Sequence, residues 1–136
     1  MRSVYEKNKL GRTIHNVLCL SDTKGMKIKM NENKEYLLSV VIPTRNRQYY
    51  AINTVKQILS VTQCNVQIVV SDNSDDLSLK KMLNDLGEDR VKYQFIRERI
   101  SGVDNYGNGI SLCDGKYVCC IGDDDGIFGE IQNVVK

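Results

Sequence analysis

Residues 37–43 have the sequence LLSVVIP, a short apolar, β-branched run closed by a proline. Such a run is typical of a buried strand. Residues 66–70 (VQIVV) and 117–121 (YVCCI) are similar, and residues 91–96 alternate between apolar and polar side chains. Strands that are almost continuously apolar occur in parallel sheets with helices on both faces.

Three helical patterns separate these four strands. Apolar residues at helical spacing are Ile52, Val55 and Leu59 within residues 47–60, and Leu79, Met82, Leu83 and Leu86 before Gly87. We expect Ser74 or Asp75 to cap the second helix. A third helical segment opens at Ser101-Gly102 and ends at Gly115. The order β-α-β-α-β-α-β predicts an α/β fold with right-handed crossovers.

Residues 1–36 differ from the rest of the chain. They carry eight Lys/Arg against four Asp/Glu and show no sustained periodicity, so we expect a basic, poorly ordered N-terminal extension. A basic extension of this kind can also contact an anionic membrane surface. Residues 37–136 carry eleven Lys/Arg against thirteen Asp/Glu and have no basic stripe, which argues against nucleic acid as a ligand.

The cysteine pattern, together with the start of the sequence, indicates a reducing compartment. The five cysteines are Cys19, Cys64, Cys113, Cys119 and Cys120, an odd number without CxxC spacing. The start of the sequence has no apolar stretch of the signal-peptide type. We therefore expect reduced thiols in a cytoplasmic protein, which can lie at the periphery of the membrane. His15 is the sole histidine, so a histidine-based site is not expected.

Polar segments follow all four predicted strands. They are residues 43–47 (PTRNR), 72–74 (DNS), 97–99 (RER) and 122–126 (GDDDG). Because ligands of open parallel sheets bind beyond the carboxyl ends of the strands, we expect these segments to form one site.

The strongest functional signal at that edge is a run of three aspartates, Asp123, Asp124 and Asp125. Three adjacent carboxylates repel one another, and a hard cation such as Mg²⁺ or Mn²⁺ relieves the repulsion through oxygen ligands. A polar turn after a strand is the simpler alternative. The sequence has no GxxxxGK[ST] loop, so binding of a nucleotide diphosphate here requires a metal. Asp72 can accept a hydrogen bond from a nucleobase or cap its own loop.

Four ordered blocks resemble family 2 glycosyltransferases. Residues 38–47 (LSVVIPTRNR) are similar to the family's SVVIPTYNR opening, and residues 69–76 (VVSDNSDD) to its VVDNGSTD segment. Residues 104–110 (DNYGNGI) with 114–118 (DGKYV) resemble NxNxAxxxAxGEYV, and residues 122–125 (GDDD) fall on the DxD-type metal motif. The resemblance covers residues 37–126.

The resemblance implies a Rossmann-like GT-A domain with sheet order 3-2-1-4 that binds a nucleotide-sugar, often a UDP-sugar, with Mn²⁺ or Mg²⁺. It places Pro43, Thr44 and Arg45 along the nucleoside, Asp72 at the base, Asn105 on a helix facing the nucleotide, Asp123 at the ribose, and Asp124, with Asp123 and Asp125, at the metal. Two residues depart from the family. Arg45 replaces a tyrosine, and Gly122 replaces the first acid of the commonest motif.

The implied reaction is inverting transfer of the sugar to a hydroxyl of a glycan or lipid acceptor. In the family the general base and the acceptor site come from a second half, so we expect the base to lie beyond Lys136. Residues 37–136 are then the nucleotide-sugar-binding half of a truncated domain. In the order 3-2-1-4 the fourth strand is an open edge, which favours self-association.

Two other functions are alternatives for this sequence. The first is a non-catalytic nucleotide-binding remnant or a gene fragment, which would share every residue named above. The second is a receiver-type signalling domain, which is disfavoured because Arg45 and Arg47 stand where it needs acids.

Overall fold

The computed structural model describes residues 5–7, 13–15 and 35–135, and the chain separates into two units, residues 1–31 and 32–136. In the first unit, β1 (Tyr5–Lys7) pairs antiparallel with β2 (Thr13–His15). Most of the basic extension lies outside the described residues, so its expected poor order stays a prediction. Lys136 lies outside them as well, and the general base expected beyond it also stays a prediction.

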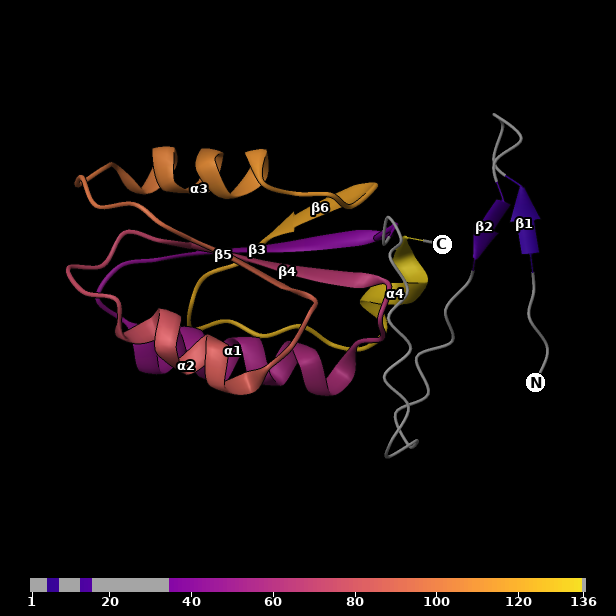
Figure 1. Cartoon of the computed structure of the whole chain (residues 1–136), viewed down its shortest axis with the longest axis horizontal. Helices are drawn as coiled ribbons and strands as arrows, with labels where there is room; N and C mark the ends of the chain where they lie inside the picture. Colours follow the sequence, from indigo (N-terminus) through magenta and orange to yellow (C-terminus); the bar gives the residue numbers. More distant parts are fainter. Residues whose placement is uncertain (1–4, 8–12, 16–34, 136) are drawn as a thin grey trace. The chain divides into compact units, whose positions relative to one another are not determined.

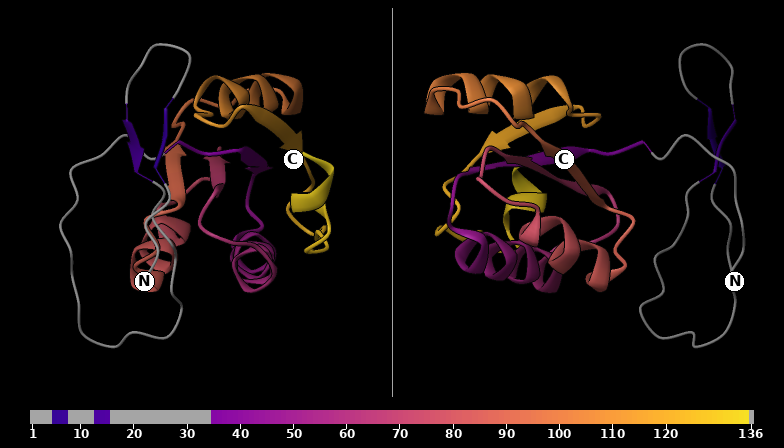
Figure 2. Two further views of the ribbon diagram at one scale, coloured as in Figure 1. Left: turned by 90° about the vertical axis from the view of Figure 1, so that its right-hand side faces the viewer. Right: turned by 60° about the vertical axis from the view of Figure 1, so that its left-hand side comes forward.

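The second unit is a four-stranded parallel sheet with helices on both faces. Its elements are β3 (Leu38–Thr44), α1 (Gln48–Val61), β4 (Val66–Asp72), α2 (Ser78–Leu86), β5 (Val91–Phe95), α3 (Gly102–Ser111), β6 (Tyr117–Cys120) and α4 (Ile131–Val134). The sheet order is β5-β4-β3-β6, which confirms the predicted order 3-2-1-4. Figures 1 and 2 show α1 and α2 on one face of the sheet and α3 on the other.

The face toward α1 and α2 holds the apolar core. Alternate residues of β3 and β4 contribute to it, together with the inner sides of both helices. They are Leu38, Val40, Ile42, Val66, Ile68 and Val70 from the strands, and Ala51, Ile52, Val55, Ile58, Leu79 and Leu83 from the helices. Burial of each valine, leucine or isoleucine among them stabilises the fold by about 1.5–3 kcal/mol. The helical spacing in the sequence predicted most of this face, and Leu59 and Leu86 pack against it partly buried. Met82 is the exception, because it is 39% exposed.

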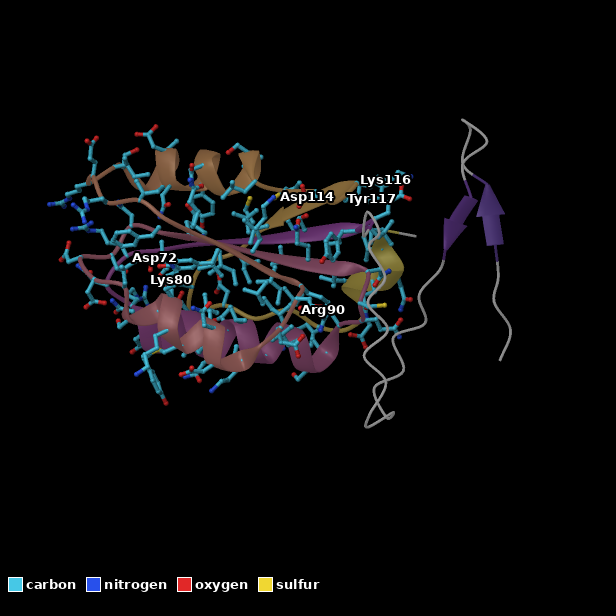
Figure 3. All side chains as sticks on the ribbon, viewed as in Figure 1. Asp72, Lys80, Arg90, Asp114, Lys116 and Tyr117 are labelled. Atoms are coloured by element: carbon cyan, nitrogen blue, oxygen red, sulfur yellow. The ribbon has the colours of Figure 1, made fainter. Side chains whose placement is uncertain are left out.

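The face toward α3 is partly polar although it is buried. Ser39 Oγ donates to Gln67 Oε1 over 2.7 Å, and Gln67 Nε2 donates to Asp114 Oδ2 over 2.7 Å. Ser71 Oγ donates to Asn105 Oδ1, also over 2.7 Å. The buried members Ser39, Gln67, Ser71 and Asn105 thus have partners, as buried polar groups must to avoid a desolvation cost, whereas Asp114 is exposed. Figure 3 shows Asp114 at the opposite end of the sheet from Asp72.

Two local expectations need correction or refinement. The expected cap of the second helix by Ser74 or Asp75 is wrong, because the helix begins later, after Leu77, and the Asp76 carboxylate accepts from Ser78 N and Oγ instead. The last strand, β6, is the predicted open edge of the sheet. Its apolar residue Val118 is accordingly 44% exposed rather than buried.

Helix α3 approaches the sheet closely at Gly109. A Cβ atom at this position would lie 2.5 Å from Cγ1 of Val41, which is much closer than packed carbon atoms allow. Gly107, two residues earlier in the same helix, has open space where a Cβ atom would lie. The glycine at 109 is therefore required by packing, and the one at 107 is not.

We predict that Gly109→Ala lowers the free energy of unfolding by about 2 kcal/mol, because the methyl group forces α3 away from β3. Gly107→Ala is the matched control and should raise it by up to about 1 kcal/mol, because alanine favours a helix over glycine. Urea denaturation of both variants measures the two changes. Equal effects in the two variants would show that α3 does not depend on this contact.

Candidate functional site

The carboxyl ends of the strands meet at one edge, and β3 lies in the middle of it. Thr44, the last residue of β3, is in register with Asp72, the last residue of β4. The carbonyl oxygen of Thr44 accepts from Asn73 N over 2.9 Å, and that of Asp72 accepts from Ile96 N over 2.8 Å. The loops after β3, β4 and β5 therefore leave the sheet side by side.

Asp123 is a buried carboxylate held by β3 and α1. It is 6% exposed, and its Oδ2 accepts a hydrogen bond of 2.8 Å from Thr44 Oγ1. Thr54 Oγ1, on the inner side of α1, is 2.8 Å from the carbonyl oxygen of Asp123 and 3.0 Å from that of Asp125. Gln57 of α1 also fixes this loop, because its amide donates to the carbonyl of Ile127. Helix α1 thus positions the backbone that carries the aspartates.

Arg47 brings two of the aspartates together. Its Nη1 lies 3.2 Å from Asp123 Oδ1, and its Nη2 lies 2.8 Å from Asp124 Oδ2. The guanidinium also lies 4.7 Å from the centre of the Tyr50 ring, a cation–π distance. The hydrogen bond from Arg47, together with its positive charge, lowers the pKa of Asp124. The repulsion expected among the aspartates is relieved here by a cation of the chain itself.

Asp125 does not join this pair. Its Oδ2 accepts from Gly122 N over 2.9 Å, so it closes its own turn. Within residues 35–135 and the two short strands, no group of three or more His, Cys, Asp or Glu side chains is arranged to hold a metal ion. The two carboxylates that converge on one cation are those of Asp123 and Asp124. This donor set fits Mg²⁺ or Mn²⁺, since such ions bind through one or two carboxylates together with substrate phosphates and water.

Asp72 is fully buried at the end of β4, and both of its carboxylate oxygens have partners. Oδ1 accepts from Ser74 N over 2.9 Å, and Oδ2 accepts from Tyr93 Oη over 2.8 Å. Burial, and secondarily the hydrogen bond to Asp72, raises the pKa of Tyr93. Asp72 therefore caps its own loop in this structure, and its role at a nucleobase stays a prediction.

The remaining predicted residues surround Thr44. Asn105 of α3 is 5% exposed and donates from Nδ2 to the carbonyl oxygen of Thr44 over 3.3 Å. Arg45 turns toward the loop after β4, where Nη1 lies 2.5 Å from the carbonyl of Asn73 and Nη2 lies 2.9 Å from Asp75 Oδ1. Pro43 is half-buried within β3. Thr44 thus contacts both Asn105, through its carbonyl oxygen, and Asp123, through its hydroxyl.

Three functional candidates were missed by the sequence reasoning. The sequence marks Arg47 only as part of a motif, Thr54 as one position of an amphipathic helix, and Tyr93 as a strand residue. The sequence did contain a signal that could have identified Arg47 and Thr54. The order 3-2-1-4 puts the end of the first strand beside the end of the fourth, and Thr54 is a polar residue on the buried side of α1. Nothing in the sequence marked the Tyr93 hydroxyl.

The fold is that of an open parallel α/β protein with polar groups gathered at the carboxyl edge of its sheet, and comparison with known proteins identifies its family. Residues 39–132 match the family described as "Glycosyl transferase family 2", and the chain belongs to this family. It is 32% identical over 91 residues, 65% of its length, to "GalNAc(5)-diNAcBac-PP-undecaprenol beta-1,3-glucosyltransferase" from Campylobacter jejuni, and covers 29% of that protein.

Solved structures share the fold. The S. aureus TarS 1-349 structure superposes with a TM-score of 0.62 at 20% identity, and its complex with UDP with a TM-score of 0.56 at 19% identity. Both comparisons cover 72% of this chain and 30% of the TarS chain. The chain thus spans less than a third of the length of these relatives. None of the helices that the structure describes is long and apolar enough to cross a membrane.

We predict that Tyr93→Phe lowers the free energy of unfolding by about 1 kcal/mol, because it removes a hydrogen bond to a buried carboxylate. Tyr49→Phe is the control. Tyr49 is 73% exposed, and its change should leave stability as it is. Thermal and urea denaturation of both variants test this. An unchanged midpoint for Tyr93→Phe would mean that the hydroxyl does not support Asp72.

Proposed function

We propose that this chain is the nucleotide-sugar-binding part of a glycosyltransferase that transfers a sugar, with inversion, from a nucleotide diphosphate sugar to an acceptor hydroxyl. The observation that carries the proposal is the convergence of Asp123 and Asp124 on one cation, at the carboxyl edge of a family 2 chain. The donor we favour is a UDP-sugar, and the UDP complex of a protein with the same fold supports this choice.

The residues at the carboxyl edge have separate roles in binding the donor. Asp123 and Asp124 would hold Mn²⁺ or Mg²⁺, which supplies Lewis-acid stabilisation of the departing diphosphate. Thr44 orients Asp123 through its hydroxyl, and Asn105 fixes the backbone of Thr44. Asp72 recognises the base through a carboxylate oxygen, which requires its bond to Ser74 N or to Tyr93 Oη to be replaced, because both oxygens are bonded in this structure.

Other residues contact the nucleoside, and a general base must activate the acceptor hydroxyl. Pro43 and Arg45 line the nucleoside, and Asp125 shapes the turn beside the ion. We assign no general base to the described residues, and the proposal keeps that group beyond Lys136, as the resemblance to the family implies.

The acceptor we propose is a glycan or a lipid-linked saccharide. The name of the Campylobacter jejuni relative, which describes an acceptor carried on PP-undecaprenol, supports this class. A lipid-linked acceptor lies at a membrane surface, so we propose a cytoplasmic protein in peripheral contact with the membrane. The basic extension, with eight Lys/Arg among residues 1–36, is suited to such contact.

UDP binding should require the divalent ion. Without a glycine-rich loop, the edge needs the ion to neutralise the diphosphate. We expect calorimetry to show UDP binding with Mn²⁺ that is lost in EDTA and is at least about tenfold weaker in Asp124→Asn, because the change removes a charged ligand of the ion. Asp85→Asn, which removes an exposed carboxylate of α2, should bind UDP as the unchanged protein does. The same affinity with Mn²⁺ and with EDTA would refute the metal assignment.

We also propose that the chain associates with itself through β6. Tyr117 N and Ile121 N bond to β3, so the backbone groups of Val118 and Cys120 face away from the described strands. An edge of this kind pairs with other strands, and a lysine on it opposes pairing. We expect light scattering to show association that Val118→Lys reduces. Val103→Lys on α3, at an 80% exposed position, should not reduce it. Association unchanged by Val118→Lys would place the contact elsewhere.

A further inference from the structure

Arg47 occupies the position where the two carboxylates of the proposed metal site converge. It is the residue just before α1, and three contacts hold its long side chain, namely those to Asp123, Asp124 and the Tyr50 ring. A side chain that is 44% exposed has many other rotamers available, and freezing it in one of them costs conformational entropy. The attraction of the two carboxylates therefore offsets the entropy that the Arg47 side chain loses.

The oxygens that Arg47 contacts are those that an incoming ion needs. Asp123 is almost completely buried, and its Oδ2 already accepts from Thr44 Oγ1. Its other oxygen, Oδ1, is the one that faces Arg47 at 3.2 Å. Asp124 likewise presents Oδ2 to Arg47 at 2.8 Å. An ion bound to these oxygens at about 2.1 Å would lie against the guanidinium and be repelled by it.

We propose that Arg47 is the built-in counter-ion of this site, that it competes with the divalent ion for Asp123 and Asp124, and that it must leave them when the ion binds. This inference rests on the proposed function, because it takes the same two carboxylates as the metal ligands. In the ligand-free chain Arg47 prevents repulsion between a buried and a half-exposed carboxylate. When the ion arrives it replaces Arg47, and the released guanidinium faces the edge where the diphosphate binds.

One consequence is coupling between ion and nucleotide. Displacing Arg47 by a divalent ion leaves an additional positive charge at the edge, and the diphosphate compensates for it. Mn²⁺ alone should thus bind weakly, and UDP should strengthen its binding. By thermodynamic reciprocity, Mn²⁺ strengthens UDP binding by the same factor. Removing the competitor should strengthen binding of the ion alone and reduce the gain that UDP brings.

The test is titration of the full 136-residue chain with Mn²⁺, followed by electron paramagnetic resonance of the free ion, with and without UDP. We expect Arg47→Gln to bind Mn²⁺ without UDP about tenfold more tightly than the unchanged chain, because a competing charge is gone, and to gain less affinity when UDP is added. Arg47→Lys keeps a competing charge, so its affinity for Mn²⁺ should be closer to that of the unchanged chain. Lys56→Gln removes an exposed positive charge elsewhere on α1 and should have little effect, which separates competition from net charge.

The possible failures are distinguishable. If Mn²⁺ binds and Asp124→Asn weakens it, but Arg47→Gln binds it no more tightly than the unchanged chain, the competition is refuted and the proposed metal site stands. If Lys56→Gln strengthens binding as much as Arg47→Gln, net charge explains the effect and the competition is also refuted. If no variant binds Mn²⁺, or Asp124→Asn binds it unchanged, both the inference and the proposed metal site are wrong.

Discussion

Strand β3 lies between β4 and β6 and pairs in parallel with both, and the site depends on this position. Parallel neighbours end at the same edge, so the segments after all three strands must emerge together. Thr44, at the end of β3, connects them. Its hydroxyl reaches Asp123, and its carbonyl oxygen accepts from Asn73 N and from Asn105 Nδ2. One residue thus links the loop after β4, helix α3 and the aspartate loop.

The two faces of the sheet stabilise this edge in different ways. The apolar face fixes α1, and α1 then holds the aspartate loop through Thr54 and Gln57. The face toward α3 uses hydrogen bonds between buried polar side chains, of which Ser71 and Asn105 lie nearest the edge. Such directional contacts specify position more strictly than apolar packing does, because an unmade buried hydrogen bond is costly. Helix α3, which approaches β3 closely at Gly109, can therefore place Asn105 against Thr44.

Sequence patterns predicted most of the fold because hydrophobic periodicity is strong in a buried parallel sheet. The resemblance supplied the strand order, and both together placed Thr44 and Asp123 at one edge. The loop cap by Asp72 was one of the two alternatives that the sequence offered, but the sequence did not predict its second partner, Tyr93, or the partners of Arg47. An exposed arginine has many rotamers, and only the three-dimensional positions of two carboxylates and an aromatic ring select one. The start of α2 was also missed, because Ser74, Asp75 and Asp76 are equally suited to capping and only the backbone path decides among them.

Charge balance connects the missing glycine-rich loop with the presence of Arg47. A buried carboxylate such as that of Asp123 needs a nearby positive charge at all times, since an unpaired buried charge is strongly destabilising. In the chain alone that charge is the guanidinium of Arg47, which also contacts Asp124. In the function we propose, a bound diphosphate would add further negative charge at the same edge, and the sequence has no GxxxxGK[ST] loop whose backbone N–H groups could neutralise it. A second cation would then be required, and the carboxylates that bind Arg47 in this structure would be the ones available to it.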